Sequence, residues 1–272
     1  AEPVRGLDAR AVEAGGREGE EEREGDEALE VDFDPSSQAP PEAQTQGEAY
    51  PSGKQAMKGR RPGFAGKAVV LISGGVDSCV ALRLALLKNL GVTALTFDYR
   101  KRSRGERIST LRIAKAERVP LERVRLDDIT SIEDLAPIER KALGKRAPDG
   151  FIAAKNAVFY SHAAHLAMRI GARYIIGGHN ASDLELFPDA SPKFFDRLQS
   201  VLDLSAPRGV RPPKLYFPLR LRSKPEVVRL GVQIRAPLDL TWSCYRDLTA
   251  PCGRCAACES RQEAFKSAGF SK

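Results

Sequence analysis

The sequence predicts an α/β fold, with a Rossmann-like parallel sheet covered by helices. From residue 67 onward, short apolar runs rich in β-branched residues alternate with segments of helical periodicity, as in chains that build strand–helix–strand units. The apolar runs lack the polar alternation of half-exposed strands, so we expect both of their faces to be buried. Polar, glycine-rich stretches follow several runs, at the sheet edge where such folds bind ligands.

The predicted elements are short and follow one another closely along the chain. Their order is strand 67–73, helix 78–90, strand 92–99, helix 105–119, strand 123–128, helix 154–171 and strand 173–178. Gly91 and Gly171 are expected to end the first and third of these helices, because glycine readily adopts the left-handed conformation of a helix stop. Ser223 and Glu226 have the spacing of a capping box, which predicts another helix start.

Composition divides the chain into three parts, which we expect to be a disordered segment 1–60, a main domain 61–240 and a C-terminal segment 241–272. Residues 1–56 contain 15 acidic and 5 basic residues and few large apolar ones, too few to offset the entropy of folding. The whole chain carries a net charge of +7, so its folded part is strongly basic and suits polyanionic partners such as nucleotides. The basic residues are scattered, and direct nucleic-acid binding is therefore not expected.

No apolar run approaches 18 residues, and the acidic segment lacks the features of a signal peptide. We therefore expect no membrane association and a cytoplasmic location.

Four of the five cysteines lie close together near the C-terminus, at Cys244, Cys252, Cys255 and Cys258. Two overlapping Cys-x-x-Cys turns and a fourth thiolate supply the ligands of a closed tetrahedral site, which is typical of structural Zn²⁺. An iron–sulfur cluster would use the same ligands and stays an alternative. A disulfide pair is the least favoured interpretation, since nothing indicates secretion.

The sequence "SGGVDS" lies between the first predicted strand and helix, where a phosphate-binding loop is expected. It lacks the lysine of a Walker loop and the spacing of the dinucleotide fingerprint. Gly74 and Gly75 allow backbone amides to approach anions, and Ser73 and Ser78 can donate hydroxyl hydrogen bonds. Asp77 would hold Mg²⁺ or cap the helix. The nucleotide-binding segment is expected to comprise Ile72, Ser73, Gly74, Gly75, Val76, Asp77, Ser78 and Cys79, with Ser73, Asp77 and Ser78 serving catalysis.

This loop resembles that of the PP-loop ATP pyrophosphatases, which cleave ATP between the α and β phosphates. Together with the cysteine cluster, the chain resembles the 7-cyano-7-deazaguanine synthase (QueC-like) family over roughly residues 67–270. The stretches "TFDYRKRSRGE", "AKNAVF" and "SDLELFPDASPKFF" support the resemblance. Arg100 and Lys101 replace the family's Gly-Gln, Ser103 replaces its His, and Lys155 replaces its Arg.

The resemblance implies that ATP and Mg²⁺ activate 7-carboxy-7-deazaguanine, that ammonia supplies the nitrogen, and that Zn²⁺ braces the pocket wall. The substrate residues that it implies are Tyr99, Lys155, Asn156, Asp183, Phe187 and Asp189, of which Phe187 would stack on the ring and the two aspartates would bind its guanine-like edge. Two alternatives stay open. One is a ligase that conjugates the activated carboxylate to an amine, including a protein acceptor, and the other is a non-catalytic nucleotide- or RNA-binding protein. A homodimer is also an open expectation.

Overall fold

The computed structural model describes residues 66–100, 102–127, 152–246 and 249–270. By its internal contacts the chain divides into the units Ala1–Lys58 and Gly59–Lys272, and every described residue belongs to the second unit. The acidic segment 1–60, predicted to be disordered, lies outside the described residues.

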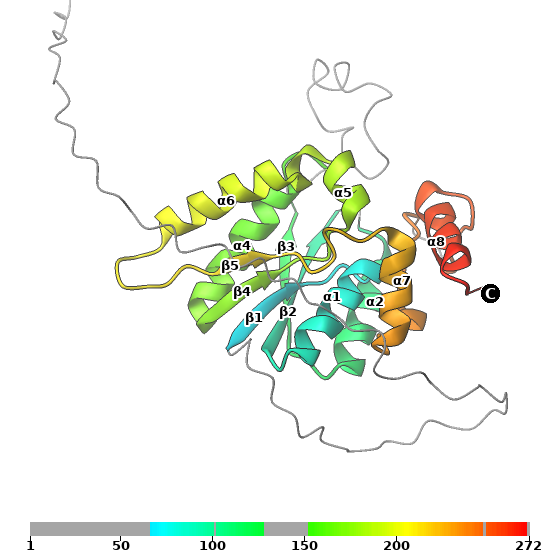
Figure 1. The fold of residues 1–272 in the computed structure, drawn as a ribbon, viewed down its shortest axis with the longest axis horizontal. Coiled ribbons are helices and arrows are strands. Elements are labelled where there is room, and N and C mark those ends of the chain that lie inside the picture. Colours follow the sequence, from blue (N-terminus) through cyan, green and yellow to red (C-terminus); the bar gives the residue numbers. More distant parts are fainter. Residues whose placement is uncertain (1–65, 101, 128–151, 247–248, 271–272) are drawn as a thin grey trace, which may run out of the picture. The chain divides into compact units, whose positions relative to one another are not determined.

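The described chain forms a five-stranded parallel sheet, as the sequence predicted (Figure 1). Its strands are β1 (Lys67–Leu71), β2 (Gly91–Tyr99), β3 (Leu121–Leu126), β4 (Ala172–Ile176) and β5 (Lys214–Tyr216). They are ordered β3-β2-β1-β4-β5, and every neighbouring pair is parallel. Strand β2 pairs with one edge of β1, and β4, which follows later in the chain, pairs with the other edge of β1. This reversal creates a topological switch point beside β1, where such sheets bind ligands.

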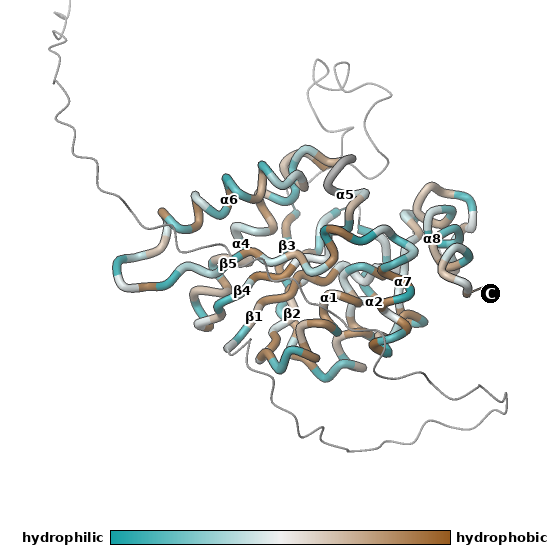
Figure 2. Tube along the Cα trace, in the orientation of Figure 1, coloured by the Kyte–Doolittle hydropathy of each residue, from teal (hydrophilic) through white to brown (hydrophobic). Residues whose placement is uncertain are grey.

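Helices cover both faces of the sheet. One apolar cluster joins the sheet to α1 (Val76–Leu87), α2 (Arg104–Ala116) and α7 (Lys224–Gln233), and the other joins it to α4 (Lys155–Ile170) and α6 (Pro192–Ser205). Successive strand residues point to opposite clusters, so that Val69 belongs to the second and Val70 to the first. Both are fully buried, and the apolar residues are concentrated on the central strands (Figure 2).

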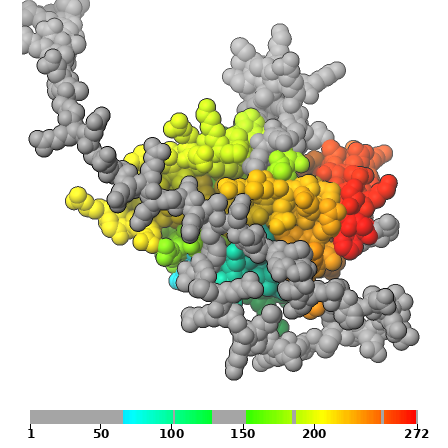
Figure 3. Space-filling view, viewed as in Figure 1, coloured from blue at the N-terminus to red at the C-terminus, as the bar shows by residue number. Residues whose placement is uncertain are grey.

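The remaining described elements are shorter or lie toward the C-terminus: α5 (Ala181–Leu186), η4 (Pro188–Ala190), η5 (Leu238–Leu240) and α8 (Ala256–Ser267). In the space-filling view α8 (red) lies against α7 (orange) (Figure 3), and the Arg229 guanidinium donates to the Ser267 carbonyl at 3.0 Å. None of the described helices combines the length and apolar character that crossing a lipid bilayer requires.

Local stop and start signals were predicted with mixed success. Gly171 caps the C-terminus of α4 with φ 68°, as expected, and the Ser223–Glu226 capping box begins α7. The expectation for Gly91 is wrong, because this glycine is the first residue of β2. Helix α1 ends at Leu87, and Asn89 with φ 57° makes the left-handed turn instead. Asparagine tolerates this conformation better than most residues.

Candidate active site

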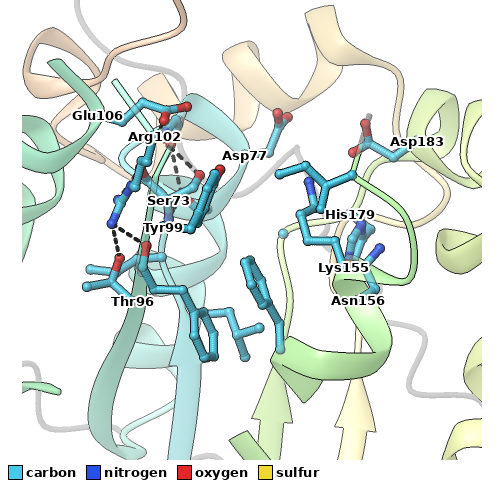
Figure 4. Close-up of a pocket in the computed structure, with 18 of the residues that line it drawn as sticks. Ser73, Asp77, Thr96, Tyr99, Arg102, Glu106, Lys155, Asn156, His179 and Asp183 are labelled. Atoms are coloured by element: carbon cyan, nitrogen blue, oxygen red, sulfur yellow. Dashed lines mark hydrogen bonds and ion pairs between the residues drawn. The ribbon is translucent and has the colours of Figure 1, made fainter. Parts of the chain in front are cut away.

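A cavity of about 670 Å³ opens at the carboxyl ends of β1, β2 and β4. Figure 4 shows two facing walls. The first comes from the loop after β1, the end of β2 and α2, and it carries Ser73, Thr96, Tyr99, Arg102 and Glu106. The second comes from α4, the turn after β4 and the start of α5, and it carries Lys155, Asn156, His179 and Asp183. Charged and hydroxyl groups thus converge on one space at the switch point of the sheet.

The loop 73–78 is held in shape by its own serines. The Ser73 N–H donates to Ser78 Oγ at 3.2 Å, and the Ser78 hydroxyl donates to the Gly75 carbonyl at 3.1 Å. The two hydroxyl oxygens lie 3.2 Å apart. Gly75 is the N-cap residue of α1 and offers no side chain to the first turn. The amides of a helix start without such a cap are the donors that bind phosphate.

Two glycines are needed for close packing around this loop. Gly74 has φ +94°, and a Cβ there would lie 2.6 Å from the Glu106 carbonyl oxygen. Gly178, in the turn after β4, would place a Cβ 2.8 Å from the Ser78 nitrogen. Neither site accepts a side chain without movement of backbone. Gly74 was predicted from the sequence as part of the loop, whereas Gly178 was not predicted to have a role.

Asp77 carries an unpaired carboxylate oxygen into this site. It is the second residue of α1, so it does not cap the helix, which was one of its two expected roles. Its Oδ1 atom is buried and accepts no hydrogen bond of normal geometry among the described residues. Burial, with a further contribution from Asp183, raises the pKa of Asp77 to about 6, although the neighbouring Asn180 amide, whose Nδ2 is also unpaired among the described residues, lowers this pKa in part. A buried acidic oxygen without a partner suits a bound cation, so the residues present fit Mg²⁺.

Arg102 joins the loop to the end of β2. The residue is buried, and its guanidinium donates to the Ser73 carbonyl at 2.8 Å, Thr96 Oγ1 at 2.8 Å and Thr110 Oγ1 at 2.6 Å. Arginine suits this position because its planar fork can satisfy several acceptors at once. Its charge lies 3.9 Å from Glu106. We infer that Arg102 holds the loop, because its N–H groups are engaged by protein oxygens.

Asp189 and Asn156 bind each other across the second wall. The Asn156 N–H donates to Asp189 Oδ2 at 2.9 Å, and Asn156 Nδ2 donates to the Asp189 carbonyl at 2.8 Å. Asp189 therefore satisfies an amide in the first turn of α4, a helix whose own N-cap, Ala154, contributes no side-chain hydrogen bond. Asp183 is partly engaged as well, since its Oδ2 accepts the Asn180 N–H at 3.1 Å in the capping box of α5.

His179 lines the same wall against a cluster of aromatic rings. Its ring centroid lies 5.1 Å from that of Phe195, 5.5 Å from that of Phe217 and 5.9 Å from that of Tyr160. Burial lowers the pKa of His179 to about 4, so the imidazole is neutral at neutral pH. By contrast, His162 and His165 are exposed on α4.

The four clustered cysteines lie close enough together to bind a single metal ion. All four Sγ atoms lie within 4.8 Å of one another, with Cys252 and Cys258 at 3.9 Å and Cys244 and Cys255 at 4.0 Å. Zn–S bonds of about 2.3 Å in a tetrahedron give S···S edges of about 3.8 Å, so the donor set fits Zn²⁺. Cys244 Sγ also accepts the N–H groups of Arg246 and Cys252, each at 3.4 Å. Such donors stabilise thiolate ligands.

Most of the residues expected from the sequence line this one cavity: Ile72, Ser73, Gly75, Asp77, Ser78, Tyr99, Lys155, Asn156, Asp183, Phe187 and Asp189. Gly74, Val76 and Cys79 do not line it. Cys79 is fully buried, its thiol donates to the Pro237 carbonyl at 3.8 Å, and burial raises its pKa to about 12, so it is a core residue. His179 and Glu106 line the cavity without having been assigned a role.

Known proteins resemble this chain over nearly all of its described part. The family described as "QueC: Queuosine biosynthesis protein QueC" matches residues 67–269. A 7-cyano-7-deazaguanine synthase of Thermoplasma volcanium is 34% identical over 212 residues, covering 75% of this chain and 88% of that protein. Proteins of the same name from Acetivibrio thermocellus and Methanothrix thermoacetophila are each 35% identical over 75% of this chain, covering 95% and 96% of their own lengths.

Proposed function

The chain belongs to the QueC family of queuosine biosynthesis proteins, and from this premise we propose that it converts 7-carboxy-7-deazaguanine to 7-cyano-7-deazaguanine with ATP and ammonia. One observation carries the proposal. A phosphate-binding loop and a wall that bears Phe187 and Asp189 line the same cavity. An enzyme that joins a nucleotide to a flat heterocyclic acid needs this pairing. We further propose that the reaction takes place in the cytoplasm.

The chemistry requires activation because a carboxylate is a poor electrophile. In the proposed reaction a carboxylate oxygen attacks the α-phosphorus of ATP, and pyrophosphate leaves. Ammonia then displaces AMP, which carries that oxygen away, and an amide remains. The amide oxygen attacks a second ATP in the same way, and loss of the second AMP gives the nitrile. Both activation steps break the α–β phosphate bond, so one loop can serve both.

On the nucleotide side, we propose that the amides of the loop and the hydroxyls of Ser73 and Ser78 bind the leaving pyrophosphate. Asp77 would hold Mg²⁺, which would neutralise phosphate charge when bound. Two observations support this assignment: the unpaired Oδ1 of Asp77 is buried, and the serine hydroxyls already lie 3.2 Å apart. The Ser78 hydroxyl now donates to the Gly75 carbonyl at 3.1 Å, so it would turn toward the phosphate on binding.

On the acceptor side, we propose that Phe187 stacks on the deazaguanine and that Asp189 binds its N1–H and exocyclic amine. Asp189 Oδ2 already accepts the Asn156 N–H, so the second carboxylate oxygen would carry most of the recognition. Lys155 and Tyr99 line the same space, and Lys155 would face the anionic carboxylate. Asn156 would act through Asp189, since its side-chain amide donates to the Asp189 carbonyl.

The cysteine cluster would hold Zn²⁺ as a structural ion. Four thiolates close the coordination sphere, and no ligand position is left for substrate. The neighbouring residues Tyr245, Arg246 and Cys255 line the cavity, which supports a role in shaping the wall.

The proposal is tested by incubating the zinc-loaded protein with ATP, Mg²⁺, 7-carboxy-7-deazaguanine and ¹⁵N-ammonium, followed by mass spectrometry. We expect ¹⁵N-labelled nitrile and AMP. Asp196→Asn serves as the matched control for Asp77→Asn, because Asp196 is exposed on α6 and does not line the cavity. Only Asp77→Asn should abolish product.

The same assay separates the alternatives. An adenylate or amide that never becomes nitrile would favour a ligase that transfers the acid to an amine, including one on a protein. No consumption of ATP would favour a non-catalytic binding protein. Either result would overturn the proposed synthase activity.

A further inference from the structure

A short segment connects the cysteine cluster to the phosphate loop. We call residues 241–246 the strap. It follows η5 and contains Cys244, the first cysteine of the cluster, and Trp242, the single tryptophan of the chain. The strap also supplies Tyr245 and Arg246 to the cavity wall.

The backbone of Trp242 binds the phosphate loop directly. Its N–H donates to the Gly74 carbonyl at 2.9 Å. The Ser109 hydroxyl lies 2.8 Å from the same carbonyl and 2.5 Å from the Leu240 carbonyl, just before the strap. Gly74 is therefore held by α2 and by the strap together, at a position where φ is +94°.

The indole of Trp242 reaches the cysteine cluster. Its Nε1–H donates to the Cys244 carbonyl at 2.8 Å, and Cys244 itself is fully buried. The ring packs so closely on Gly105 of α2 that a Cβ there would overlap it. One residue thus makes contact with the loop, with α2 and with a predicted metal ligand.

We propose that Trp242 is a positioning residue through which the metal-bound cysteine cluster fixes the phosphate loop for ATP. The role in ATP binding rests on the proposed function, whereas the mechanical connection does not.

A bound ion fixes the four thiolates and hence the Cys244 backbone, whose carbonyl orients the indole. Packing on Gly105 then keeps the Trp242 N–H directed at Gly74. Without the ion, the four sulfur atoms within 4.8 Å of one another keep only weak hydrogen bonds such as that from the Cys252 N–H to Cys244 Sγ, so the strap and the loop should both loosen. The core strands are not joined to the strap by these bonds, so the protection of their amides from exchange should not change.

Two substitutions interrupt this connection without touching a cysteine or a loop residue. Trp242→Phe keeps the backbone N–H and an aromatic ring but removes the Nε1–H donor. Gly105→Ala keeps the tryptophan and displaces its ring. The matched control is Gly91→Ala, whose Cβ would lie 3.5 Å from Lys67 Cγ, an ordinary contact.

Amide hydrogen exchange by mass spectrometry measures the loop directly. We expect peptides that cover residues 73–78 to exchange faster in both variants, and in wild-type protein treated with a zinc chelator, while peptides from β1 and β4 do not change. Trp242 fluorescence in wild-type protein should shift on chelation. The Kd for ATP should rise about tenfold in the variants, as expected for one lost hydrogen bond and its neighbours, while zinc content stays at that of the Gly91→Ala control.

Three results would overturn the inference: unchanged exchange of the loop after chelation, loop exchange in both variants equal to that of the control, or loss of zinc in parallel with loss of ATP binding. The last would mean that Trp242 merely supports the cluster. Failure of the wild-type protein to bind ATP would instead contradict the proposed function, and loop exchange would still decide the role of Trp242.

Discussion

Asp77→Asn should stabilise the protein and remove its ATP chemistry at the same time. The Asp77 carboxylate carries a buried oxygen without a hydrogen-bond partner, and burial raises its pKa from 3.8 to about 6. A raised pKa means that the folded state binds the proton more tightly than the unfolded chain does, so ionisation of Asp77 destabilises the fold. Asparagine has nearly the same shape and carries no charge.

The size and pH dependence of the effect follow from that pKa. The difference between 3.8 and about 6 corresponds to about 3 kcal/mol. Because the side chain as a whole is half-buried, water screens part of this cost, and we expect a gain of about 1–2 kcal/mol in the variant. The gain should be absent well below pH 3.8, where both states are protonated, grow as the pH rises from 3.8 toward 6, and stay constant above 6.

The assay is urea denaturation of both proteins without nucleotide or Mg²⁺ at several pH values, together with ATP–pyrophosphate exchange. Asp196→Asn, which removes an exposed charge, should leave both measurements close to wild type. A variant that is less stable than wild type at pH 7.5, or that retains pyrophosphate exchange, would refute the reasoning.

Three further predictions concern the rest of the site. Asp189→Asn keeps an oxygen for the Asn156 N–H but turns an amide toward the donor-rich edge of the substrate, so it should weaken deazaguanine binding by about 10–100-fold. Calorimetric titration should show ATP affinity unchanged, and the opposite pattern would mean that the acceptor wall is misassigned. In Gly178→Ala, the new Cβ would lie 2.8 Å from the Ser78 backbone nitrogen, so the turn after β4 must move away from Ser78. The free energy of unfolding, measured by urea denaturation, should fall by about 1–3 kcal/mol. Stability equal to that of Gly91→Ala would argue against this packing. We expect the wild-type protein to bind one zinc ion per chain, and Cys255→Ser should lower both this zinc content and Tm, the latter by several degrees. Iron with sulfide in elemental analysis of the wild type would contradict the zinc assignment.

The parts of the fold that sequence reasoning found are those with strong local signals. The apolar run of β1, the Gly171 stop and the Ser223–Glu226 capping box each depend on residues within one turn or strand. Strand β5 was not predicted, because Lys214–Tyr216 has three residues and is a strand through its pairing with β4. Helix α6 was also not predicted, although Ser191 and a proline at its first position are a recognisable start signal.

For the site, the sequence indicated residue types but not their partners. Most of the predicted residues line one cavity because the carboxyl ends of parallel strands meet at one edge. The bond between the Asn156 N–H and Asp189 joins residues 33 positions apart, and no local pattern encodes it. The packing of Trp242 on Gly105 and its bond to Gly74 likewise depend on tertiary structure. The need for glycine at position 178 could not be read from the sequence, since it arises from the approach of another element.

The central claim is that the carboxylate is activated by attack on the α-phosphate of ATP, and isotope transfer tests it most directly. The zinc-loaded protein would be given 7-carboxy-7-deazaguanine with both carboxylate oxygens labelled with ¹⁸O, together with ATP, Mg²⁺ and ammonium. Each of the two oxygens should leave on an AMP, so mass spectrometry should find one ¹⁸O in every AMP that accompanies nitrile formation. Label found in pyrophosphate or inorganic phosphate, or AMP without label, would contradict the account.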